Sequence, residues 1–446
     1  MYKRQIISNL KEWKNRTDRK PLILRGARQV GKTTAVNMFS KEFDTFIELN
    51  LDLFSDLQIF KEEYGIDDII QAIQVFKNIS FQKGSVLVFI DEIQNSPQAV
   101  KMLRYFYEKR PDIFVIAAGS LLEIAIEKQD ISFPVGRVEF LYLYPFNFGE
   151  FLRASQENIL TEIIDSGKIP DYAHDKLMML FHKYTLIGGM PEVLKKYLEK
   201  QDINTLKTIY QSLLVSYVND SEKYARNHTI KRVIGHCLNS IPNETGKRIK
   251  FQNFGNSDYK SREVSESMRL IEKAMLISLV YPVTNTSLPL ITDFKKSPKL
   301  QFIDTGLINY FTCIQPEFFK FDDLNAIYKG FIAEHIVRQE IIASDFTHNN
   351  PVPIWTRESK SSNAEVDILI TVKGTVIPVE VKSGTAGSLK SLHLFMDESK
   401  NDLAVRLCAN KLNLETVTTP SGKTFRLLNL PYYLAGYLEK FVGKFL

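Results

Sequence analysis

Short apolar runs alternate with amphipathic segments over the first third of the chain. Runs of about four to eight apolar residues are typical of buried strands, and helical spacing separates them. The predicted strands cover residues 21–25, 45–51, 86–90, 113–120 and 138–146. The predicted helices cover residues 3–14, 32–43, 66–78 and 96–111. Strands that alternate with helices predict a parallel, doubly wound α/β sheet.

The pattern changes after residue 147. Residues 147–235 are predicted to be helical throughout, with an interruption at 186–191. From 236 to 315, helices precede short strands at 277–283 and 289–294, an order that resembles a winged helix. After residue 316, a helix (326–343), strands, a helix (386–399) and further strands predict a separate α/β domain. The predicted domains are residues 1–150, 151–235, 236–315 and 316–446.

The turn after the first predicted strand has a nucleotide-binding signature. Residues 26–33 have the pattern Gly-x-x-x-x-Gly-Lys-Thr of a P-loop, between a strand and a helix. Backbone N–H groups of such a loop surround phosphates, and the helix N-terminus attracts the anion. Lys32 is expected to reach the β- and γ-phosphates of ATP, and Thr33 to bind Mg²⁺. The predicted nucleotide-binding residues are Gly26, Ala27, Arg28, Gln29, Val30, Gly31, Lys32, Thr33 and Thr34.

Two acids end the third predicted strand. Residues 86–90 are apolar, and Asp91 and Glu92 follow them. We expect Asp91 to hold Mg²⁺ through water and Glu92 to orient and polarise the attacking water. An acid that starts a helix after a strand would give the same pattern, but the place downstream of a P-loop favours a Walker B motif.

Two further polar residues are candidates for catalysis beside Lys32 and Glu92. Ser120 ends the fourth predicted strand, where a polar sensor near the γ-phosphate is expected if that strand lies between the P-loop and Walker B strands. Ser120 can also serve as the N-cap of the next helix. Arg137 is a candidate arginine finger, with a plain surface residue as the alternative. Arg28, inside the P-loop, is a weaker candidate for that finger.

Acids also alternate with apolar residues near the end of the sequence. Residues 363–372 and 375–383 both alternate, and a two-residue turn between them predicts a hairpin. This turn places Asp367 opposite Glu380. Two carboxylates that face each other repel, unless a divalent cation binds between them.

A third acid is predicted on helix 326–343. Glu334 lies in an apolar stripe and needs a partner, which is either Arg338 one turn later or the same metal. Glu334, Asp367 and Glu380-x-Lys382 together resemble the PD-(D/E)xK nucleases. The resemblance implies that the three acids bind Mg²⁺ and that Lys382 stabilises the attacking water or the phosphate. The alternative is a nuclease-like fold used only for binding or structure.

Several longer phrases carry a resemblance over essentially the full chain. Beside the P-loop and the Asp-Glu strand, these are GRVEFLYLYPFNFGEFL (136–152), IGGMPEVL (187–194), KSPKLQFIDTGL (296–307) and EVD…VEVKS. The sequence resembles bacterial and archaeal AAA-family ATPases that carry a C-terminal domain of unknown function. The resemblance implies an ATP-binding core with a helical lid, followed by a winged helix and a restriction-endonuclease-like fold.

Composition narrows the class of protein. The 446 residues are 44% hydrophobic and 24% charged, which is ordinary for globular domains. Three cysteines without a Cys-x-x-Cys pair argue against a disulfide scaffold and a zinc site, and fit a reducing cytoplasm. The charged, amphipathic start of the sequence is not expected to be a signal peptide, and no apolar run is long enough to predict a membrane span.

The charge of the sequence does not decide which kind of partner the chain binds. The net charge of +5 permits nucleic acid without requiring it. Residues 221–273 hold 11 Lys and Arg against 6 Asp and Glu, so phosphate contact is one interpretation, and a protein-interaction surface or a solvated face is another. We therefore expect Mg²⁺-dependent ATP hydrolysis coupled to a nuclease-like, DNA-acting module. The alternative is an ATP/ADP-switched protein-interaction ATPase with a silent C-terminal domain, and the oligomeric state stays open.

Overall fold

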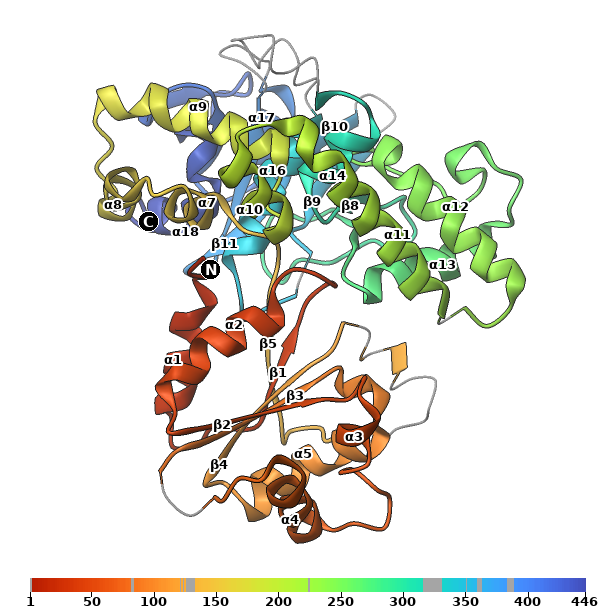
Figure 1. Ribbon diagram of the computed structural model, residues 1–446. Coiled ribbons are helices and arrows are strands. Elements are labelled where there is room, and N and C mark those ends of the chain that lie inside the picture. The colour runs from red at the N-terminus through yellow and green to blue at the C-terminus, as the bar shows by residue number, and fades with distance from the viewer. Residues whose placement is uncertain are drawn as a thin grey trace. The chain divides into compact units, whose positions relative to one another are not determined.

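The structure is a computed structural model, and it divides the chain into two compact units (Figure 1). It describes residues 2–81, 84–120, 122, 124–125, 133–223, 225–315, 331–349, 351–358, 363–382 and 389–446. The first unit comprises Met1–Tyr144, Lys273–Met275 and Asp345–Asn349. The second comprises Pro145–Glu272, Leu276–Ser344 and Asn350–Leu446. The second unit holds most residues of the last three predicted domains, and the division into four domains stays a prediction.

The first unit is built on a five-stranded sheet in the order β2-β3-β4-β1-β5 (Figure 1). The strands are β1 (Leu22–Arg25), β2 (Thr45–Asn50), β3 (Val86–Asp91), β4 (Ile113–Ala118) and β5 (Glu139–Tyr142). All neighbouring pairs are parallel, as the alternating pattern predicts. Because β4 lies between β1 and β3, the strand that precedes Ser120 has the predicted place beside the P-loop strand.

Amphipathic helices supply the rest of this unit's core. They are α1 (Ile6–Asn15), α2 (Lys32–Phe39), α3 (Phe54–Leu57), α4 (Ile66–Lys77) and α5 (Pro97–Lys109). The helix α5 begins where Ser96 Oγ accepts the N–H of Ala99 at 3.1 Å, with a proline at its first position. Apolar side chains of α4 and α5 pack with those of β2, β3 and β4. The strand β3 is buried at all six positions, which fits the apolar run over residues 86–90 before Asp91.

The second unit begins with helices, as predicted. They are α7 (Phe148–Ala154), α8 (Asn158–Ser166), α9 (Asp171–Ile187), α10 (Pro191–Lys200), α11 (Lys207–Lys223), α12 (His228–Glu244) and α13 (Ser261–Lys273). The predicted interruption separates α9 from α10, where Gly188 has a φ of 74° and Pro191 starts the next helix. No helix among the described residues is long and apolar enough to cross a membrane.

The strands that follow α13 differ in part from the prediction. They are β6 (Ile277–Val280), β7 (Pro282–Val283) and β8 (Lys299–Phe302), and β6 pairs with β8 in antiparallel fashion. The strand predicted at 289–294 is wrong, because that segment forms only one isolated bridge. Its apolar residues Ile291 and Phe294 are 64% and 74% exposed, whereas β8 is buried throughout. The winged helix stays a prediction.

The remainder of the second unit is an α/β region with two sheets. Its helices are α14 (Thr305–Phe311), α16 (Phe331–Ser344), α17 (Lys390–Glu398) and α18 (Leu438–Val442). Its strands are β9 (Ile354–Glu358), β10 (Asn363–Val366), β11 (Ile368–Val372), β12 (Thr375–Val381), β13 (Leu403–Cys408), β14 (Asn413–Thr418) and β15 (Thr424–Pro431). The sheet orders are β10-β9-β7 and β11-β12-β13-β15-β14, and β12, β13 and β15 run parallel.

The predicted hairpin is present, but the strand before its turn is shorter than expected. Val372 pairs with Thr375, and the turn residues Lys373 and Gly374 both have positive φ, as a type I′ turn requires. The alternating run 363–372 is not one strand, because it breaks at Asp367 into β10 and β11, which belong to different sheets. Arg338 donates to the Asp367 carbonyl, so a side chain satisfies the backbone at the break.

A buried polar network joins three helices of the second unit. Glu340 on α16 accepts the Phe148 N–H at the start of α7 at 2.9 Å and the Tyr184 hydroxyl of α9 at 2.6 Å. Nearby, Asp304 accepts the Gly189 N–H at 2.6 Å. Burial raises the pKa of Glu340 to about 7 and that of Asp304 to about 6.

The raised pKa of Glu340 predicts a pH dependence of stability. Between about pH 4.5 and 7 the folded chain retains a proton that the unfolded chain releases, so this group makes stability fall as pH rises. The full contribution is about 3 kcal/mol. We expect Glu340→Gln to flatten the change in urea midpoint across this window. An equal slope in the wild type and the variant would contradict the assignment.

Candidate nucleotide site and C-terminal charge cluster

The P-loop, residues 26–33, follows β1 and includes the first two residues of α2. A Cβ atom at Gly26 would lie 2.3 Å from the Leu143 carbonyl oxygen, and Gly31 has a φ of 97°, so both positions favour glycine. The Lys32 ammonium donates to the Gly26 and Ala27 carbonyl oxygens at 2.8 and 2.9 Å. The loop therefore curls around the lysine that the sequence assigns to the phosphates.

Lys32 is buried, so its protonation state depends strongly on the groups around it. Burial lowers the pKa of Lys32 to about 8, although the carboxylates of Glu92 and Asp91 oppose the shift. Phosphate oxygens beside the ammonium would favour its charged form. Of the other loop residues, Val30 is buried, whereas Gln29 and Thr34 are exposed.

The structure brings the P-loop and Walker B residues together. The Thr33 hydroxyl donates to Asp91 Oδ2 at 2.7 Å, and Asp91 Oδ1 accepts the Glu92 N–H at 3.0 Å. A hydroxyl and a carboxylate are ligands that Mg²⁺ accepts, so these two side chains fit the predicted ion. Asp91 ends β3 at the same edge of the parallel sheet as the P-loop after β1.

One residue that contacts Glu92, Gln94, was not predicted from the sequence. Glu92 has a left-handed backbone, with a φ of 52°, and its Oε2 accepts the Gln94 side-chain N–H at 2.5 Å. Gln94 is 6% exposed. The pattern Asp-Glu-x-Gln contains the pair, but its spacing alone does not say that the chain turns back between the two side chains. Gln94 is therefore a positioning residue for the predicted base.

Gly119 leaves room for Gln94. A Cβ atom at Gly119 would lie 2.2 Å from Gln94 Oε1, the flexible end of that side chain. We expect Gly119→Ala to displace Gln94 and to lower kcat for ATP about tenfold or more, because misplaced catalytic groups lose rate. The affinity for ATP should change little. Steady-state kinetics and nucleotide binding test this prediction. An unchanged kcat would show that Gln94 does not position Glu92.

Ser120 and Arg137 lie at opposite edges of the five-stranded sheet. Ser120 follows β4 at the edge of the sheet that carries the P-loop and Asp91, where a sensor is expected. Its predicted role as a helix N-cap concerns residues that lie largely outside the described ranges. Arg137 precedes β5, which runs parallel to β1, so it lies at the opposite edge and pairs with Glu108 at 2.9 Å. The structure does not bring Arg137 to the P-loop of its own chain.

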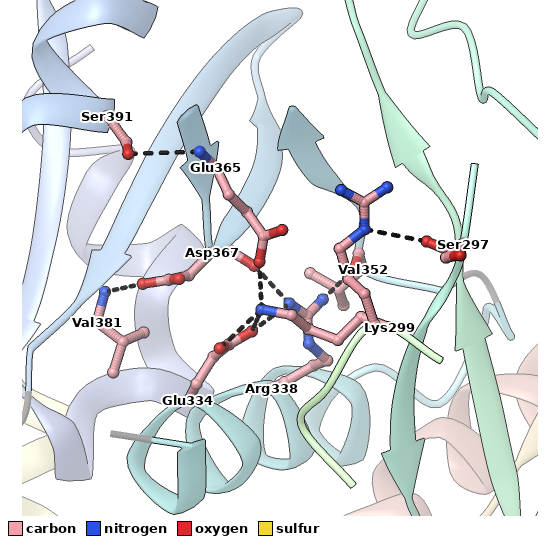
Figure 2. Close-up of polar contacts among 10 residues, drawn as sticks. Ser297, Lys299, Glu334, Arg338, Val352, Glu365, Asp367, Val381 and Ser391 are labelled. Carbon is pink, nitrogen blue, oxygen red and sulfur yellow. Dashed lines mark hydrogen bonds and ion pairs between the residues drawn. The ribbon is translucent and has the colours of Figure 1, made fainter. Parts of the chain in front are cut away.

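The C-terminal acids belong to a charge cluster that includes an unforeseen lysine. Lys299 of β8 donates to both carboxylate oxygens of Glu334, at 2.7 and 2.9 Å, and contacts Glu365 Oε1 at 2.6 Å (Figure 2). Arg338 lies 3.3 Å from Glu334 Oε1. The partner suggested for Glu334 one helical turn later is therefore present, with a second cation beside it.

Asp367 and Glu380 face other groups. Asp367 Oδ2 accepts the Val381 N–H at 2.8 Å, and Figure 2 shows this carboxylate turned toward Val381. Glu380 Oε1 pairs with the Lys382 ammonium at 2.6 Å. Burial raises the pKa of Asp367 well above its usual range, and the carboxylates of Glu334 and Glu380 add to the shift. Burial also raises the pKa of Glu380.

These contacts do not fit the magnesium site predicted from the resemblance to nucleases. Glu334 bonds to Lys299, Asp367 to a backbone N–H and Glu380 to Lys382, so each carboxylate already has a partner within the chain. Within the described ranges, no group of three His, Cys, Asp or Glu residues could hold a metal ion. The metal-binding role of these acids stays a prediction, and the resemblance did not reveal the cation from β8, which is distant in sequence.

Three family models match successive parts of the chain. A model described as an AAA domain matches residues 18–152. Two domains of unknown function, DUF8612 and DUF4143, match residues 178–317 and 329–433. Together with the strand order and the P-loop, the first match supports a P-loop ATPase fold for residues 18–152. The other two matches assign no activity.

Some solved structures have a distant likeness. A Walker-type ATPase of Pyrococcus abyssi is 14% identical, with a TM-score of 0.45, over 70% of this chain and 96% of that chain. A signal transduction ATPase with numerous domains from Pyrococcus horikoshii is 12% identical, with a TM-score of 0.27, over 75% of this chain and 47% of that chain. Drosophila ORC bound to DNA is 15% identical, with a TM-score of 0.24, over 59% of this chain and 65% of that chain. No curated protein matches the sequence.

Proposed function

We propose that this chain binds ATP with Mg²⁺ and hydrolyses it. The observation that carries the proposal is the contact between Thr33 of the P-loop and Asp91 of the Walker B strand, beside the buried Lys32. When bound, the ion would neutralise charge on the transferred phosphoryl group. Thr33 and Asp91 would hold the ion, and Lys32 and the loop N–H groups would hold the phosphates. Glu92, oriented by Gln94, would position and polarise water.

For the C-terminal region, residues 316–446, we propose recognition of a partner and no metal-dependent cleavage. The cations Lys299 and Arg338 hold Glu334, and Asp367 accepts a backbone N–H. ATP binding and hydrolysis would then switch the recognition surface. This proposal predicts that nucleotide changes protease protection across residues 147–320. Identical protection with ATP, with ADP and without nucleotide would contradict the switch.

A DNA-cleaving module is the second candidate. It is supported by the Glu380–Lys382 pair at the end of β12, by Asp367 between β10 and β11 and by the basic stretch 221–273. A basic surface of this kind can bind phosphates.

One experiment separates the two candidates and tests hydrolysis as well. The full chain is incubated with plasmid or single-stranded DNA and Mg²⁺ or Mn²⁺, with and without ATP, and phosphate release is measured in the same samples. We expect Mg²⁺-dependent phosphate release that DNA does not stimulate, and intact DNA. Cleavage by the wild type that Asp367→Ala abolishes would establish the nuclease, whereas absent phosphate release would overturn the ATPase.

A further inference from the structure

The cluster around Lys299 is enclosed by elements of the second unit that are far apart in sequence. Lys299 lies on β8, Glu334 and Arg338 on α16, and Glu365 on β10 (Figure 2). The side chain of Lys299 is 8% exposed, and that of Glu334 is 13% exposed. Charges with so little access to water interact strongly, and each one is costly without its partner.

Both cations donate to groups of the cluster and of the backbone around it. Lysine has three donors and no acceptor, and the Lys299 ammonium contacts three carboxylate oxygens between 2.6 and 2.9 Å. Arg338 bonds to the Glu334 carboxylate and to the backbone carbonyl oxygens of Asp367 and Val352. Figure 2 shows both cations between the helix α16 and the Glu365 side chain.

The acids of this region would otherwise suit a hard divalent cation. Glu334, Glu365, Asp367 and Glu380 supply oxygen ligands, which Mg²⁺ and Mn²⁺ prefer. Glu380 Oε2 is buried and has no hydrogen-bond partner among the described residues, so the cluster retains an acceptor that its cations do not use. The positive charge between Glu334 and Glu365 nevertheless comes from the chain itself.

We propose that Lys299 is the resident cation of this cluster, in the role that a divalent metal ion would have, and that the region folds without metal. Removing the lysine charge leaves the carboxylates of Glu334, which is 13% exposed, and Glu365, which is 30% exposed, without their shared counter-charge. A divalent cation then becomes their best partner. The proposal does not depend on ATP hydrolysis, which concerns the first unit.

The test compares full-length, nucleotide-free chains with Mn²⁺ alone as the probe. We expect Lys299→Met to lower the melting temperature by several degrees and Mn²⁺ to restore it in a concentration-dependent way, because a ligand of the folded state stabilises it. Mn²⁺ should leave the wild type unchanged. The double variant Lys299→Met/Glu334→Gln should show no restoration. Lys373→Met is the matched control, because this exposed lysine bonds to the Gly443 carbonyl.

Two results would overturn the proposal. The first is a Lys299→Met chain that is as stable as the wild type, or one that is destabilised and gains nothing from Mn²⁺. The second is Mn²⁺ binding by the wild type, measured by electron paramagnetic resonance, that Asp367→Asn abolishes. This second measurement needs no lysine variant, so it decides the question even where Lys299→Met fails to fold. Equal Mn²⁺ signals from the wild type and Asp367→Asn would support the resident lysine.

Discussion

Replacement of Glu92 by glutamine is expected to stop ATP turnover while ATP still binds. The amide keeps the size of the side chain and can still accept the N–H of Gln94, but it cannot take a proton from water. General-base catalysis contributes about 10²- to 10⁴-fold, so kcat should fall at least a hundredfold. Lys32, Thr33 and Asp91 are unchanged, so the variant keeps the contacts that bind ATP equally in the ground state and the transition state. The Kd for ATP should therefore stay within about threefold of the wild-type value.

A matched substitution at the other edge of the sheet gives the control. Glu108 pairs with Arg104 and Arg137 near the end of α5, away from the P-loop. Glu108→Gln should therefore leave kcat and the Kd for ATP nearly unchanged. Phosphate release and equilibrium nucleotide binding measure both variants. A Glu92→Gln chain that still turns over would show that another group activates the water.

Alanine at Gly189 is expected to destabilise the second unit strongly. The new Cβ atom would lie 2.1 Å from the Phe146 carbonyl oxygen and 2.9 Å from its nitrogen. These are backbone atoms, and Phe146 N–H donates to the Gly189 carbonyl at 2.7 Å, so the two segments cannot separate without losing that bond. Overpacking of this kind costs about 3 kcal/mol.

Urea unfolding followed by Trp355 fluorescence measures the effect of Gly189→Ala. The chain has two tryptophans, so Trp13→Phe in every variant leaves the buried Trp355 of the second unit as the reporter. Gly235→Ala is the control, because the nearest atom to its new Cβ is Glu222 Oε1 at 3.5 Å. In the interior of α12 alanine is favoured by about 0.5–1 kcal/mol, so this control should be slightly more stable. Equal midpoints for both variants would contradict the close approach.

Local patterns were sufficient for much of the fold. The parallel strands of the first unit, the P-loop and the turn at Lys373-Gly374 depend on neighbours in sequence, so their residues predict them. The strand predicted at 289–294 failed because apolar composition does not show whether a partner strand exists. The single strand predicted over residues 363–372 was wrong for a related reason. The alternation of apolar and polar residues continues through Asp367, although the backbone leaves one sheet for another there.

Long-range contacts decided the rest of both candidate sites. The sequence by itself predicted which side chains would bind phosphate or Mg²⁺, because a P-loop and a Walker B strand combine short spacings with fixed backbone geometry. Only the tertiary structure placed Gln94 on Glu92, put Arg137 at the far edge of its sheet and inserted Lys299 between Glu334 and Glu365. Charge compensation in a buried cluster depends on which elements pack against one another. Lys299 of β8 is far from these acids in the sequence and contacts them only in the folded chain.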